Sequence, residues 1–165
     1  MRRARPIRRR ARAAPRIAIA ASRFNQEITD GLLKGARQAL AEGGIAAGRI
    51  EVFWAPGAFE LPLLADRIAA SGRFAAVVCL GAVIRGETYH FEVIANQAAR
   101  GIAAVGLKHG LPVTLGVITT HTLEQAEARA RNDSENRGRQ AAQAALELLD
   151  QLERIGKQSG LSAES

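Results

Sequence analysis

Residues 75–92 read AAVVCLGAVIRGETYHFE, and this stretch carries the strongest indication of the fold. The apolar run Ala75–Leu80 predicts a buried strand, and the spacing of apolar residues after His90 predicts a helix. A Gly- and Arg-containing turn between a strand and a helix can hold an anion, because helix N-terminal N–H groups and the helix dipole favour negative charge. His90 carries the side chain best suited to moving protons near neutral pH. We therefore expect a small anionic substrate beside an acid–base group.

Strand and helix patterns alternate on both sides of this stretch. Short apolar runs predict four strands: Ile17–Ala21, Ile50–Trp54, Ala75–Leu80 and Pro112–Thr119. Helical spacing predicts a helix that begins at an Asn25 cap and ends at Gly43, and further helices over about 59–70, 91–109, 123–130 and 141–155. This alternation favours an α/β fold, a three-layer αβα sandwich with a four-stranded parallel sheet in flavodoxin-like order.

The net charge of +7 comes from one end of the chain. Residues 1–16 contain eight arginines and no acid, so the rest of the chain has a net charge of −1. At 165 residues the chain fits one domain. We expect residues 1–15 to form a disordered Arg-rich arm, residues 16–157 the domain, and residues 158–165 a frayed tail. Contact of the arm with nucleic acid is the less favoured alternative.

Composition argues against several classes of protein. No segment approaches the about 20 apolar residues of a membrane span, and the run Ile17–Ala21 is too short for a signal peptide. Cys79 is the only cysteine, which excludes an internal disulfide and favours the cytoplasm. The three histidines lack metal-site spacing, and neither a Walker loop nor a G-x-G-x-x-G motif is present. We therefore expect neither a metal site nor a nucleotide cofactor.

The functional site of a parallel sheet lies beyond the carboxyl ends of its strands. Four segments follow the predicted strands: residues 22–25, 55–60, 81–90 and 119–122. Phe24, in a polar loop, can stack on a flat heterocycle or fold back onto the core. Glu60 can accept hydrogen bonds from hydroxyl groups or merely favour a helix N-terminus. For His90 and Arg129, the alternative to a functional role is a solvated helix face.

These segments together resemble the lumazine synthase family. The matching pieces are SRFN at 22–25, PGAFELP at 56–62, GAVIRGETYHF at 81–91, GVITT at 116–120 and LEQA at 123–126. The likeness runs from about residue 16 to residue 155, and the pieces agree in order, spacing and position at strand ends. The resemblance implies condensation of 5-amino-6-ribitylaminouracil with 3,4-dihydroxy-2-butanone 4-phosphate. The products would be 6,7-dimethyl-8-ribityllumazine, phosphate and water, formed by a transferase of riboflavin biosynthesis without any cofactor.

The resemblance also implies roles for individual residues. His90 would be the catalytic residue that shuttles protons. The pyrimidine and ribityl contacts would come from Phe24, Ala58, Phe59, Glu60, Val83, Ile84, Leu115 and Arg137. The phosphate contacts would come from Arg85, Gly86, Glu87, Thr88 and Arg129. In the family the site lies between neighbouring subunits of a pentamer, which implies a homo-oligomer: a pentamer, a decamer or a sixty-subunit icosahedral capsid. Riboflavin synthase is a further implied partner, and no membrane is involved.

The chain departs from the usual family pattern after Arg129. The family commonly continues Ala-Gly-Thr-Lys, whereas residues 130–133 here are Ala-Arg-Asn-Asp, and Leu115 stands where a phenylalanine is common. Arg137 replaces a usual lysine and keeps its charge. Two alternatives therefore stay open. One is a flavin- or lumazine-binding paralogue with low turnover, and the other is a shell-forming scaffold whose arm binds a polyanion.

Overall fold

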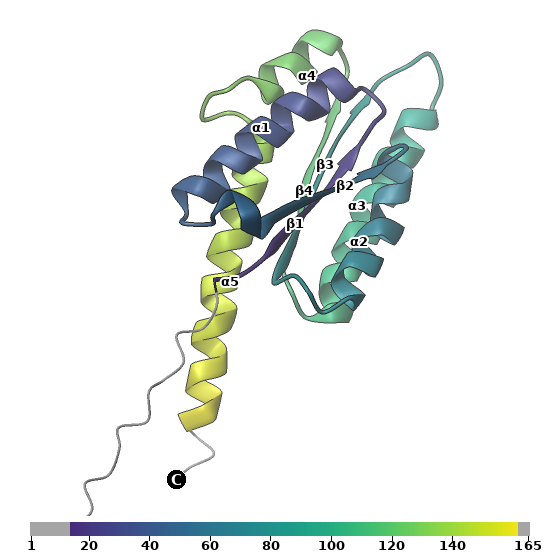
Figure 1. Ribbon diagram of the computed structural model, residues 1–165. Coiled ribbons are helices and arrows are strands. Elements are labelled where there is room, and N and C mark those ends of the chain that lie inside the picture. Colours follow the sequence, from purple (N-terminus) through teal and green to yellow (C-terminus); the bar gives the residue numbers. More distant parts are fainter. Residues whose placement is uncertain (1–13, 162–165) are drawn as a thin grey trace, which may run out of the picture.

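A computed structural model describes residues 14–161 of the chain (Figure 1). Residues 1–13 of the predicted arm and residues 162–165 of the predicted tail lie outside the described residues. The last helix continues to Leu161, beyond Lys157, where we placed the end of the domain. No helix in the described part of the chain is long and apolar enough to cross a membrane.

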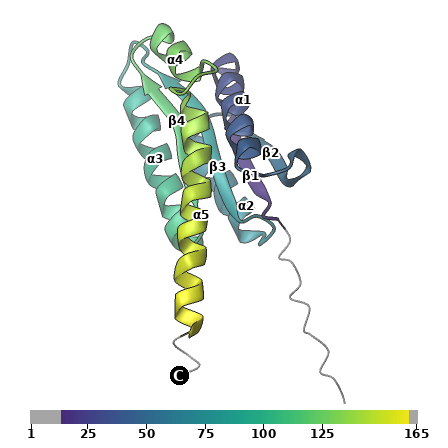
Figure 2. The same ribbon diagram turned by 90° about the vertical axis from the view of Figure 1, so that its left-hand side faces the viewer.

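Four parallel strands form the sheet, in the order β2-β1-β3-β4. The strands are β1 (Ile17–Ser22), β2 (Ile50–Ala55), β3 (Ala76–Ile84) and β4 (Val113–Thr120). The helices are α1 (Gln26–Glu42), α2 (Leu61–Ala70), α3 (His90–His109), α4 (Leu123–Ala130) and α5 (Arg137–Leu161), with 3-10 turns η1 (Ala47–Arg49) and η2 (Ala58–Glu60). Helices α1, α4 and α5 cover one face of the sheet, and α2 and α3 cover the other (Figures 1 and 2). The predicted αβα sandwich with flavodoxin-like order is therefore confirmed.

Strand β1 occupies the interior of the sheet, between β2 and β3. All six of its residues are buried, because both faces of the strand are covered by helices. Its alternate side chains pack into different layers: Ile17 and Ile19 against α1 and α5, Ala18 and Ala20 against α2 and α3. The predominance of small and β-branched side chains in β1 follows from this double burial.

Strand β3 is longer than the sequence pattern predicted. It continues past Leu80 to Ile84, and its last four residues pair with Val117–Thr120 of β4. The end of β1 packs closely here, since a Cβ atom on Gly81 would lie 3.1 Å from the Cβ of Ser22. The predicted anion-holding turn is therefore shorter, and residues 81–84 belong to the sheet.

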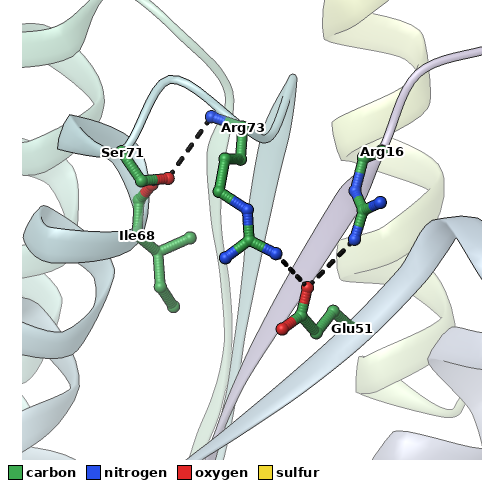
Figure 3. Close-up of polar contacts among 5 residues, drawn as sticks. All are labelled: Arg16, Glu51, Ile68, Ser71 and Arg73. Carbon is green, nitrogen blue, oxygen red and sulfur yellow. Dashed lines mark hydrogen bonds and ion pairs between the residues drawn. The ribbon is translucent and has the colours of Figure 1, made fainter.

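An ionic cluster joins three elements at the amino end of the sheet. One carboxylate oxygen of Glu51, on β2, accepts from Arg16 at 3.1 Å and from Arg73 at 2.9 Å (Figure 3). Both guanidinium groups also lie over the Phe74 ring, at 5.6 and 5.0 Å from its centroid. These contacts connect the start of β1 to β2 and to the loop before β3.

Asp66 makes a second ionic contact, between α2 and the end of α3. Its carboxylate lies 2.8 Å from Lys108 Nζ and 2.8 Å from His109 Nε2. Hydrogen bonds from Lys108 and then from His109 lower the pKa of Asp66 to about 2. A lowered carboxyl pKa stabilises the fold above the unfolded-state value, and this contribution is lost as the pH falls toward the folded-state pKa.

Asn136 holds α1, α4 and the start of α5 together. It is fully buried, and its Nδ2 atom donates to the carbonyl oxygens of Gly31, Ala130 and Arg131 at 2.8–3.1 Å. Its Oδ1 atom accepts from the N–H of Arg139 at 2.9 Å, which caps α5. One side chain thus satisfies four backbone groups.

We predict that Asn136→Ala lowers the free energy of unfolding by about 2–4 kcal/mol, because three backbone carbonyl groups lose a donor from a buried side chain and α5 loses its cap. Urea denaturation measures the change. Asn132→Ala is the matched control, since Asn132 is exposed in the same loop. Equal stability losses in the two variants would contradict the role given to Asn136.

Candidate functional site

Three of the predicted post-strand segments meet in one pocket at the carboxyl ends of β1, β2 and β3. Its volume is about 260 Å³. The lining residues are Phe24, Gly57, Ala58, Phe59, Glu60, Ala82, Val83, Ile84, His90, Phe91 and Ile94. The pocket thus brings together an aromatic ring, a carboxylate and an imidazole that lie far apart in the sequence, and seven of its residues are predicted site residues.

Phe24 is held at the pocket although its ring is 70% exposed. The backbone N–H groups of Arg23 and Phe24 donate to the carbonyls of Ala55 and Pro56, at 2.9 and 3.1 Å. The loop after β1 therefore runs beside the end of β2. An exposed, backbone-anchored ring at the edge of a pocket is suited to stacking on a planar ligand.

Asn25 fixes the same loop in a way the sequence pattern did not predict. It stands at the N-cap of α1, but its side chain makes no cap hydrogen bond. Its Nδ2 atom instead donates to the carbonyl of Ala82 on β3, at 3.0 Å. Its φ of 57° lies in the left-handed region, which asparagine tolerates better than most residues. The side chain therefore ties the Phe24 loop to the strand across the pocket.

The end of β3 offers backbone groups to the pocket. The paired register of β1 and β3 ends at Ala21 and Leu80, so β3 has no strand neighbour on that side beyond this point. The Arg85 N–H donates to Thr120 of β4 at 2.9 Å. Backbone groups of successive strand residues point to opposite sides, so the N–H and C=O of Ile84 face the open side and those of Val83 face β4. Val83 contributes a buried apolar side chain instead.

Glu60 lies where the 3-10 turn η2 passes into α2. Its carboxylate is close to the backbone, since a Cβ atom on Gly57 would lie 3.1 Å from Glu60 Oε2. Glycine at position 57 therefore leaves room for this carboxylate beside the pocket. The neighbouring Phe59 ring is 54% exposed. The segment thus presents a hydrogen-bond acceptor and an apolar surface side by side.

His90 is the first residue of α3 and lines the pocket. Its backbone N–H donates to Thr88 Oγ1 at 3.4 Å. The predicted phosphate-binding residues Arg85, Gly86, Glu87 and Thr88 form the exposed turn between β3 and α3, and none of them lines this pocket. They nevertheless lie at the N-terminus of a 20-residue helix, where backbone N–H groups are open.

The structure does not bring the other predicted site residues into this pocket. Leu115, Arg129 and Arg137 line a separate hollow of about 540 Å³ along β4, α4 and the start of α5. The two hollows have no lining residue in common. The separation follows from the layers, since α4 and α5 cover the opposite face of the sheet from α3 (Figure 2).

Sequence reasoning missed several residues of the pocket. Ala82, Phe91 and Ile94 line it, and Asn25 braces it from outside. Ala82, Phe91 and Ile94 have no polar side chain by which the sequence could identify them as site residues. Asn25 could have been identified, because it directly follows Phe24 in a polar loop. Cys79 takes no part, because burial raises the pKa of its thiol to about 12 and keeps it neutral.

Comparison with known proteins agrees with this arrangement. A family model described as 6,7-dimethyl-8-ribityllumazine synthase matches residues 14–153. The chain is 55% identical over 141 residues to 6,7-dimethyl-8-ribityllumazine synthase 1 of Caulobacter vibrioides, covering 86% of this chain and 92% of the relative. It is 47% identical over 140 residues to the synthase of Protochlamydia amoebophila, covering 85% and 81%. It is 50% identical over 139 residues to that of Gemmatimonas aurantiaca, covering 84% and 85%. The chain therefore belongs to the 6,7-dimethyl-8-ribityllumazine synthase family.

Proposed function

We propose that this protein condenses 5-amino-6-ribitylaminouracil with 3,4-dihydroxy-2-butanone 4-phosphate to give 6,7-dimethyl-8-ribityllumazine. The observation that carries the proposal is the pocket in which Phe24, Glu60 and His90 meet in a chain of this family. The purified full chain, given both substrates, is expected to form the fluorescent lumazine. Tight ligand binding without product would favour the low-turnover paralogue instead.

The chemistry needs proton transfers and positioning. The 5-amino group attacks the ketone and loses water to form an imine, phosphate then leaves, and the 6-ribitylamino nitrogen closes the ring with loss of a second water. Every step moves a proton and none changes the overall oxidation level. A histidine beside two held reactants therefore supplies what is required, because holding two reactants in reactive geometry is itself a large part of the catalysis.

The pocket suits the pyrimidine substrate. Phe24 stacks on the ring, and the open N–H and C=O groups of Ile84 pair with the polar edge of the heterocycle. Val83 and Ala58 form an apolar wall. Glu60, beside Phe59, accepts hydrogen bonds from the ribityl hydroxyls. The carboxylate and the ring lie on opposite segments of the pocket, which matches a substrate with a flat end and a polyol end.

The phosphate substrate would bind at the turn Arg85–Thr88, next to His90. The turn precedes a long helix, whose dipole favours the anion. We assign the second phosphate contact to Arg129 of a neighbouring copy, since Arg129 of the same chain lines a different hollow. Leu115 and Arg137 of that neighbour would cover the pyrimidine. The active site would then be complete only between two copies.

A ring of five copies is the assembly that we propose. The family relationship supports it, and so does the division of the site between two faces of the chain. Leu115, on the edge strand β4, is 51% exposed beside the hollow that holds Arg129. A head-to-tail contact that repeats around a closed ring would cover this edge and give every copy one complete site.

We predict that His90→Ala lowers kcat about a hundredfold or more, the size typical for loss of a general acid–base group. Stopped-flow or steady-state fluorescence measures the change, and circular dichroism monitors the fold. His109→Gln is the control, because His109 lies at the other end of the same helix and glutamine retains a donor for Asp66. Turnover near wild type in His90→Ala would remove the proton-transfer role.

Arg129→Ala is expected to raise KM for the phosphate substrate about 10- to 100-fold, the size of a lost charge-assisted hydrogen bond. KM for the pyrimidine substrate should change little. Arg131→Ala is matched in charge, two residues further along, and is expected to leave both constants near wild type. An equal rise of KM for the phosphate substrate in both variants would indicate a general effect of positive charge rather than a phosphate contact by Arg129.

Mixing subunits that carry these two substitutions tests the shared site directly. Subunits carrying His90→Ala are unfolded and refolded together with subunits carrying Arg129→Ala. In a random one-to-one mixture, about a quarter of the interfaces pair an intact His90 with an intact Arg129. Activity at low phosphate-substrate concentration should therefore rise well above that of either variant alone. A mixture that shows only the average of the two variants would contradict a site built from two copies.

A further inference from the structure

Helix α3 approaches the start of α2 closely at Gly101, where the ring of Pro62 packs against the glycine. A Cβ atom built on Gly101 would lie 2.6 Å from both the Cβ and the Cγ of Pro62. Carbon atoms in contact are normally about 3.5–4.0 Å apart. The two helices therefore touch more closely here than any residue other than glycine would allow.

The contact joins the two helices whose first turns adjoin the pocket. Pro62 follows Glu60 by two positions, within the first turn of α2. Gly101 lies on the helix that begins at His90, about three turns further along. A change in the distance between α2 and α3 at this point would therefore change the distance between Glu60 and His90 across the pocket.

Neither side of the contact can yield easily. The pyrrolidine ring of Pro62 is closed onto the backbone, so its Cβ atom cannot swing away and only the ring pucker can change. Behind Gly101, Ala98 and Ile102 are 0% and 1% exposed and pack into the core of the α2/α3 layer. A close-packed core transmits a displacement rather than absorbing it. An added methyl group would therefore move α3 relative to α2 by about 1 Å, the shortfall from normal contact distance.

We infer that Gly101 and Pro62 are positioning residues, which set the distance between His90 and Glu60 although neither of them lines the pocket. The inference rests on the proposed function, since it concerns the geometry of that same site. It assigns a catalytic consequence to a contact that would otherwise be read as helix packing alone.

The test compares Gly101→Ala with Gly106→Ala in the full chain. Both substitutions are in the interior of α3 and gain the same helix propensity. A Cβ atom on Gly106 would lie 3.4 Å from its nearest neighbour, the Leu111 carbonyl oxygen, which is ordinary contact. Gly101→Ala is expected to lower kcat about tenfold or more, because small misplacements of reacting groups are costly. KM for the phosphate substrate should stay near wild type, and Gly106→Ala should match wild type throughout.

Removing the ring atoms of Pro62 should restore the kcat that Gly101→Ala loses. Pro62→Gly removes the two atoms that the new methyl group would meet. The double variant Gly101→Ala/Pro62→Gly is therefore expected to regain most of the kcat lost in Gly101→Ala, even though Pro62→Gly alone weakens the start of α2. Urea denaturation of the same variants separates the two roles, because a positioning role predicts that kcat recovers in the double variant even where the free energy of unfolding does not.

Three results would overturn the inference while leaving the proposed function intact. They are wild-type kcat in Gly101→Ala, equal losses in Gly101→Ala and Gly106→Ala, and no recovery in the double variant. If Gly101→Ala does not fold, Pro62→Ala loosens the same contact from the other side. It should lower kcat several-fold, and unchanged kinetics would then count against the inference. A wild-type protein without turnover would instead refute the proposed function itself.

Discussion

The burial of β1 on both faces and along both edges is the constraint on which the rest of the structure depends. A strand in this position can carry only apolar or small side chains, and all six of its residues are buried. It fixes the order of the sheet, because β2 and β3 must pair on either side of it. It also places the loop that carries Phe24 between the segments that follow β2 and β3, and the pocket forms at that meeting point.

The division of the chain into two helical layers explains why the predicted site residues line two separate hollows. Helices α2 and α3 begin at the pocket and contribute Glu60 and His90, whereas α4 and α5 carry Arg129 and Arg137 on the opposite face. Arg129 and Arg137 therefore line a different hollow of the same copy. In the ring of copies that we propose, each interface would join one set to the other.

Most of the fold could be predicted from the sequence, because the strands are short apolar runs and the helices show regular apolar spacing. The end of β3 could not, since the pairing of residues 81–84 depends on β4, which lies more than thirty residues away in the chain. Asn25 was placed correctly at the start of α1, but its bond to Ala82 is a tertiary contact that no local pattern reveals. The site residues were grouped by their place at strand ends. That argument holds for Phe24, Glu60 and His90, and it cannot tell which face of the sheet Arg129 reaches.

The four hydrogen bonds of Asn136 have a consequence for how this protein can vary. They hold the carbonyls of Ala130 and Arg131 and the first turn of α5, and within the loop Asp133 Oδ1 accepts from the N–H of Glu135 at 2.9 Å. Asn132 and Ser134 are exposed within that frame. These two positions can therefore vary without loss of the backbone hydrogen bonds that lead from Arg129 into α5. For protein engineering, positions 132 and 134 are sites where side chains can be randomised on a fixed backbone.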